Sequence, residues 1–158
     1  MSRAFVREAE GGEAFEDLPD RTISPHHLVT PAGLARMDSE IESLEKRLAE
    51  AQLRDDKAEV ARLSRDLRYW SARRVSAEVV PPPTDTSHVR FGAEVTFERE
   101  DGRRQTYRIV GEDEADPAKG SLSYVSPLAQ ALMGKEVGDT VTVGQGKAEI
   151  VSISIRDP

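Results

Sequence analysis

The sequence predicts an α+β protein in which a helical hairpin precedes a small antiparallel β-sheet with one short helix. Between residues 30 and 80, apolar residues recur at helical spacing in two stripes, whereas beyond residue 80 they recur at every second position. Three prolines, at 81–83, separate the two patterns and favour a stiff linker. We therefore divide the chain into an extension (1–29), a hairpin (30–80) and a sheet unit (81–158).

The composition suits an elongated element joined to a modest globular part. Of 158 residues, 37% are hydrophobic and 32% are charged, which is poor in apolar side chains for one compact core. The absence of cysteine excludes a disulfide framework, a thiol nucleophile and a thiolate metal site. No apolar run is long enough to span a bilayer and no leader pattern stands at the N-terminus, so we expect a soluble, cytoplasmic protein with no membrane partner.

The charge argues for a protein partner. A net charge of −7 disfavours tight autonomous binding to nucleic-acid phosphates, which requires clustered Lys and Arg. Residues 30–80 carry ten acids and ten bases, the balance expected of two helices joined by ion pairs. We expect a monomer.

The first helix has a clear start. Thr30 can cap the free amides, and Pro31 suits the first helical position because its missing N–H is not needed there. Apolar residues then alternate in steps of three and four, which predicts a coiled-coil seam: Leu34, Met37, Ile41, Leu44, Leu48 and Ala51.

The second helix repeats this spacing, with Val60, Leu63, Leu67 and Trp70, and its pattern reaches Ala77. Only the polar residues 54–57 separate the stripes, so the helices must fold back antiparallel, with arms of about 22 residues or about 33 Å. The arginines of the second arm are then expected to face the glutamates of the first: Arg62, Arg65, Arg68, Arg73 and Arg74.

The extension lacks the apolar residues needed for a core of its own, so we expect it to be mobile or laid along another surface. His26 and His27 are adjacent and cannot share one helix face as metal ligands do. We expect both to be solvent-exposed loop residues.

The sheet unit shows alternation on either side of an Asp101-Gly102 turn, and two closing strands at 140–143 and 148–155. Ser126 and Pro127 read as the cap and first residue of a short helix that stops at Gly134.

Several runs within residues 89–155 strongly resemble the C-terminal domain of GreA/GreB transcript-cleavage factors, in the family's order and spacing: Phe91-Gly92-Ala93-x-Val95-Thr96, Tyr107-x-Ile109-Val110-Gly111-x-Asp113-Glu114-Ala115-Asp116, Ser126-Pro127-Leu128-Ala129-x-Ala131-Leu132-x-Gly134-Lys135 and Gly138-Asp139-x-Val141. Thr30-Pro31-x-Gly33-Leu34 is similar to the start of the family's hairpin, and the extension is similar to that of GreB-like members.

The resemblance implies an FKBP-like sheet domain that docks at the rim of the RNA polymerase secondary channel, while the hairpin projects toward the active site. Such a protein is a binding factor with no catalytic residues or cofactor of its own. The resemblance also implies polymerase contacts by Ser126 and Pro127, although helix capping explains both equally well. Asp116 could direct its charge at a basic partner surface, or it could serve turn formation.

Acids at the hairpin tip would carry the chemistry in this family, where they help to hold the polymerase's second Mg²⁺ and orient a water that cleaves backtracked RNA. The candidates here are Asp55, Asp56 and Glu59, with Asp56 and Glu59 as the ligands of a shared Mg²⁺. Two interpretations remain open, because Asp56 as N-cap with Glu59 at the third helical position would also explain the pair.

The arms are shorter than the family's by about ten residues each, which removes about 15 Å of reach. Both cleavage stimulation and simple occupancy of the channel remain open, and the shorter reach favours occupancy. A function of another class is also open, because relatives with short hairpins include a regulator of nucleoside diphosphate kinase.

Overall fold

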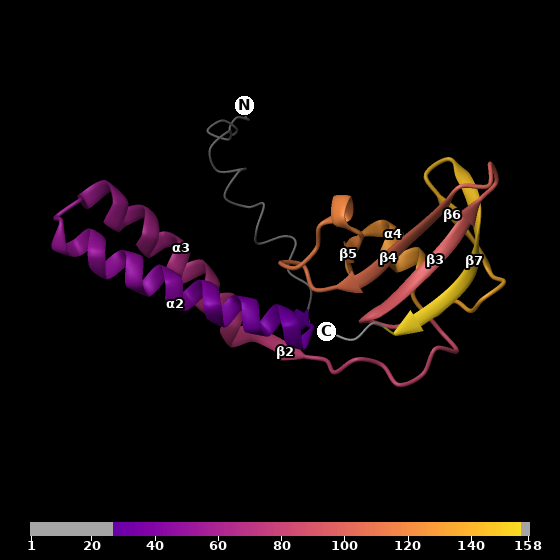
Figure 1. Cartoon of the computed structure of the whole chain (residues 1–158), viewed down its shortest axis with the longest axis horizontal. Helices are drawn as coiled ribbons and strands as arrows, with labels where there is room; N and C mark the ends of the chain where they lie inside the picture. The colour runs from indigo at the N-terminus through magenta and orange to yellow at the C-terminus, as the bar shows by residue number, and fades with distance from the viewer. Residues whose placement is uncertain (1–26, 156–158) are drawn as a thin grey trace, which may run out of the picture.

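The computed structural model describes residues 27–155 and shows an α+β protein made of two parts (Figure 1). The antiparallel helices α2 (Pro31–Leu53) and α3 (Lys57–Ser76) form a hairpin that projects from one end of a curved β-sheet. No helix among the described residues is both long enough and apolar enough to cross a membrane.

The hairpin begins as its sequence predicts, and most of the predicted seam packs between its helices. The Thr30 hydroxyl accepts a hydrogen bond from the Gly33 N–H at 3.0 Å, and Pro31 occupies the first turn of α2. Leu44, Ala51 and Leu63 are buried between the helices. Four half-buried residues of the predicted seam pack against them: Leu48, Val60, Leu67 and Trp70.

The predicted ion pairs between the arginines of α3 and the glutamates of α2 are wrong. In the described part of the chain, the ion pair that joins the two helices runs from Arg74 Nε to Asp38 Oδ1 at 2.7 Å. Arg62 pairs with acids of its own helix, and Arg73 turns toward the sheet unit. The seam takes up the facing surfaces of the helices, so long basic side chains lie outside it.

A short parallel sheet stands at the base of the hairpin. Strand β1 (His27–Val29) pairs with β2 (Ala77–Val79), so α3 ends one residue before the predicted Ala77. This pairing places His27 in the interior, at 4% exposure, and the prediction of an exposed loop histidine is wrong for this residue. The remainder of the predicted extension, His26 included, lies outside the described residues.

The main sheet has five strands in the order β5-β4-β3-β7-β6. Their bounds are β3 (Ala93–Arg99), β4 (Arg104–Val110), β5 (Ser121–Ser123), β6 (Thr140–Val143) and β7 (Gly146–Ile155). The sheet was predicted to be antiparallel throughout, but β4 and β5 run parallel. The loop after β4 and the 3₁₀ turn η1 (Pro117–Lys119) bring the chain back before β5 begins, which makes a parallel pair possible.

The core of the sheet unit lies on one face of this sheet and is covered by α4 (Pro127–Leu132). Phe97 and Ile150 are fully buried there, and the ring of Tyr107 stacks on that of Phe97 with centroids 6.1 Å apart. The register shifts by one residue between Thr96 and Phe97, which turns the central strands without opening the core.

The hairpin and the sheet unit meet at the loop that follows β4. Three consecutive acids of this loop, Glu112, Asp113 and Glu114, bond to the base of the hairpin. Strand β1 adds a further link, because the Leu28 N–H donates to the Tyr124 hydroxyl at 3.1 Å. The hairpin and the sheet unit are therefore joined by polar contacts from this loop and from Tyr124.

Candidate functional site

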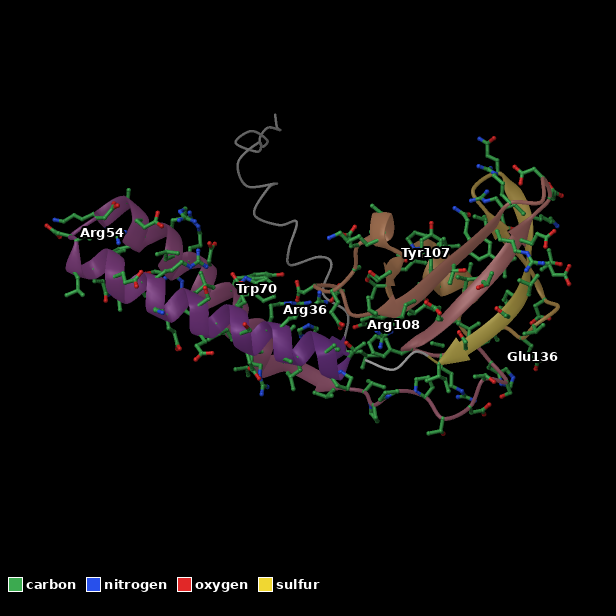
Figure 2. The ribbon with its side chains drawn as sticks, in the orientation of Figure 1. Arg36, Arg54, Trp70, Tyr107, Arg108 and Glu136 are labelled. Atoms are coloured by element: carbon green, nitrogen blue, oxygen red, sulfur yellow. The ribbon has the colours of Figure 1, made fainter. Side chains whose placement is uncertain are left out.

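The hairpin tip, residues 54–57, is a tight turn at the end of the molecule farthest from the sheet, where Figure 2 labels Arg54. Arg54 caps α2, and its N–H donates to the Glu50 carbonyl at 3.1 Å. Asp55 has a φ of 57°, a left-handed conformation that aspartate tolerates better than most residues. This conformation reverses the chain and allows α3 to start two residues later.

Asp56 is the N-cap of α3. Its Oδ1 accepts a hydrogen bond from the Glu59 N–H at 3.2 Å, which satisfies one of the free amides at the helix start. The capping interpretation of this residue is therefore confirmed. One carboxylate oxygen of Asp56 is engaged within the protein.

Glu59 is held by Arg62 one turn along α3. Arg62 Nε donates to Glu59 Oε1 at 3.2 Å, and its terminal nitrogen bonds to the second carboxylate oxygen. Hydrogen bonding to Arg62 lowers the pKa of Glu59, so the group stays ionised but both of its oxygens have a partner.

Asp55 is the remaining acid of the tip and is exposed. Within residues 27–155, no side chain or amide bonds to its carboxylate. The neighbouring side chain of Leu53 is 88% exposed. The tip thus presents one unengaged carboxylate beside one apolar side chain.

The tip does not fit a resident magnesium ion. Mg²⁺ requires close to octahedral coordination by oxygen, and the residues described here include no group of three or more His, Cys, Asp or Glu placed to hold a metal. One unengaged carboxylate supplies at most two of the needed ligands. A metal role for Asp56 and Glu59 stays a prediction that requires a partner to supply the remaining ligands.

The second candidate surface is the edge of the sheet at β5. Asp116 precedes η1, and its backbone pairs with that of Ser121 in an isolated bridge. The Asp116 carboxylate makes no capping bond to η1. It lines a groove of about 410 Å³ between the sheet and the start of α2, beside basic side chains from three different elements: Arg36, Arg108 and Lys119.

Figure 2 labels two of these bases, Arg36 on α2 and Arg108 on β4, near the junction of the two parts. The sequence reasoning did not connect them with Asp116, because the residues are far apart along the chain and share no motif. Only the return of the chain into β5 brings Arg108 opposite Ser121.

Ser126 and Pro127 lie beyond the other end of β5. The Ser126 hydroxyl accepts from the Ala129 N–H at 3.3 Å, and Pro127 is the exposed first residue of α4. The predicted capping role of Ser126 is confirmed. Asp116 and the Ser126-Pro127 pair therefore lie on either side of the same edge strand in the chain. Their partner contacts stay a prediction.

The fold joins a helical arm to a small sheet, as the sequence predicts. The family model described as "Transcription elongation factor, GreA/GreB, C-term" matches residues 84–155. The chain is 37% identical over 139 residues to the transcription elongation factor GreA of Desulfovibrio desulfuricans, a match that covers 78% of this chain and 86% of that protein.

A second relative is the transcription elongation factor GreB of Pseudomonas aeruginosa, 37% identical over 144 residues, with 79% of this chain and 85% of that protein covered. Among solved structures, a GreA/GreB factor from Nitrosomonas europaea is 22% identical and covers 81% of this chain and 98% of its own, at a TM-score of 0.41. These sequence matches define a transcription factor. The chain belongs to the GreA/GreB family.

Proposed function

We propose that this protein binds RNA polymerase through the β5 edge of its sheet and places its hairpin, as a coiled coil, in the secondary channel. The observation that carries the proposal is the separation of the two candidate surfaces. The β5 edge lies at the base of the hairpin, and the tip lies at the far end of α2, whose 23 residues span about 35 Å.

Occupancy of the channel, without cleavage of RNA, is the mode of action that the tip favours. Asp56 is engaged as a helix cap and Glu59 by Arg62, so that Asp55 is the one acid of the three with both oxygens unengaged in the described structure. Cleavage would need carboxylates about 2.1 Å from a metal ion. The protein would act by excluding other ligands from the channel, during elongation or initiation.

Two measurements test the proposal. Core RNA polymerase should co-purify with the full chain. The full chain should also compete with an authentic GreA factor for binding to the polymerase. On a backtracked elongation complex, the wild-type protein should occupy the channel without accelerating RNA cleavage. The variant Asp55→Asn should then bind as the wild type does.

Failure to bind polymerase would overturn the function itself. Stimulation of cleavage that disappears in Asp55→Asn/Asp56→Asn, with binding retained, would overturn occupancy and establish a cleavage factor. Glu42→Gln, an exposed acid of α2 about three turns from the tip, is the control. The alternative of a kinase regulator has no support, because the relatives reported above are named as transcription elongation factors.

A further inference from the structure

The side chain of Glu114 is buried at the start of α2, with only 5% of its surface exposed. One carboxylate oxygen accepts the Thr30 N–H at 2.9 Å and the Gly111 N–H at 3.1 Å. The other accepts the Thr30 hydroxyl. A residue of the sheet unit thus binds the very residue that caps the hairpin's first helix.

Two glycines form the space around this carboxylate. A Cβ atom at Gly33 would overlap the Glu114 carboxylate, and one at Gly111 would lie 2.6 Å from the Leu28 carbonyl oxygen and 2.7 Å from Glu114 Oε2. Neither glycine has a positive φ. Their lack of a side chain is therefore required for space and not for backbone conformation.

The environment suits a charged carboxylate in spite of its burial. The amides at the N-terminus of α2 carry a partial positive charge that favours an anion, and the Arg36 guanidinium lies 4.0 Å from Glu114 Oε1. Charge-assisted hydrogen bonds of this kind are about twice as strong as neutral ones.

A second attachment joins the same loop to the other helix. Arg73, near the end of α3, bonds to Glu112 at 3.0 Å and to Asp113 at 2.8 Å. Glu114 therefore anchors α2 while its two preceding neighbours anchor α3. Attachment at one point would leave the hairpin free to pivot, whereas attachment at two points on different helices restrains its rotation.

We propose that Glu114 is a positioning residue that sets the direction of the hairpin relative to the sheet, with Arg73 as the second anchor. Because the hairpin is about 35 Å long, a rotation of about 10° at its base would move its tip by about 6 Å. The anchoring itself is a property of the free protein. Its effect on where the tip lies in a polymerase channel rests on the function proposed above.

Distance measurements between two spin labels test the anchoring directly. The chain contains no cysteine, so Lys57→Cys near the tip and Lys147→Cys on β7, both exposed, give two unique labelling sites. The parent protein should give one narrow distance distribution. Glu114→Ala should give a broadened or divided distribution, because it removes the oxygen that accepts the Thr30 and Gly111 N–H groups. Glu114→Gln should broaden it less, because its amide oxygen can still accept both N–H groups, whereas its NH2 group cannot accept the Thr30 hydroxyl.

Gly33→Ala supplies a coupled test, because its added methyl group displaces the carboxylate. It should broaden the distribution in the parent and have little further effect when combined with Glu114→Ala. Glu98→Gln, which alters an exposed ion pair elsewhere on the sheet, is the control and should leave the distribution unchanged.

A parent-like distribution in Glu114→Ala would overturn the proposal, as would equal broadening by the control. Additive effects of Gly33→Ala and Glu114→Ala would also overturn it. If Glu114→Ala does not fold, as judged by circular dichroism, Gly33→Ala decides the question. No polymerase is present in this experiment, so its failure leaves the proposed function intact, and loss of polymerase binding leaves the anchoring intact.

Discussion

Arg73 of α3 and Asp113 of the loop after β4 form an ion pair that joins the hairpin to the sheet, with Arg73 Nε 2.8 Å from Asp113 Oδ2. The Arg73 side chain is only 9% exposed, and the Asp113 carboxylate 13%. The phenol of Tyr69 also donates to Asp113 at 2.7 Å, and burial together with this bond raises the pKa of Tyr69 to about 12, so the phenol keeps its proton.

Removing Arg73 should be far more costly than removing its neighbour Arg74. Arg73→Ala leaves two carboxylates with little solvent and no cation, which costs about 3 kcal/mol in comparable buried pairs. Arg74 is 42% exposed and pairs with the exposed Asp38, so Arg74→Ala should cost less than about 1 kcal/mol. Urea unfolding of both variants measures the difference. Equal losses would contradict the structural importance of the Arg73 anchor.

His27 should make the stability of the protein depend on pH. Burial, and then the positive charge of Arg73, lower the pKa of His27 below its ordinary 6.5, although Asp113 and Glu112 act in the opposite direction. Nδ1 lies 2.8 Å from the Ser76 hydroxyl, whereas Nε2 is buried with no hydrogen-bond partner in the described structure. Asp113 lies 3.7 Å from Nε2 but is already bound by Arg73, so we expect a neutral ring.

The sign follows from proton uptake. In the window between the lowered pKa and 6.5, the unfolded chain binds more protons than the folded one. The free energy of unfolding should therefore be largest above this window and fall as the pH drops through it, by at most about 1.4 kcal/mol per pH unit. His27→Gln should remove this component of the slope, which lies below about pH 6.5. An unchanged slope in the variant would show that His27 is not its source.

Leu44 provides a test of the hairpin seam. It is 1% exposed between the helices, so Leu44→Ala should lower the free energy of unfolding by about 2–5 kcal/mol. Leu53 is 88% exposed at the tip, and Leu53→Ala should change the free energy of unfolding by less than about 0.5 kcal/mol. Similar losses from the two substitutions would mean that the seam is misassigned.

The division of the chain near residue 80 can be tested with a fragment. Residues 81–158 contain all five strands of the main sheet together with Asp116, Ser126 and Pro127, so the fragment should retain much of the binding to polymerase. It lacks Arg73 and β1, so it should be less stable than the full chain. A polymerase-binding assay checks the retained binding, and thermal unfolding checks the lower stability. A fragment that folds but does not bind polymerase would place the docking surface on the hairpin.

Local patterns in the sequence were sufficient to predict the helices and most of the strands. Thr30, Asp56 and Ser126 each cap a helix as predicted, because a cap is a contact over three residues and leaves its mark on a short stretch of sequence. The seam through Leu44 and Leu63 was equally readable, since the spacing of apolar side chains decides which face of a helix is buried.

Tertiary structure alone decided which charged residues are engaged and which are left for a partner. Arg62 and Arg73 look alike in the sequence, but one bonds within its helix and the other reaches the loop after β4. The partners of Arg62 lie within four positions on its own helix, whereas those of Arg73 lie about forty positions away and are brought to it only by folding. The burial of His27 and the parallel pairing of β5 have the same origin, since both follow from strand pairing over long separations in the chain.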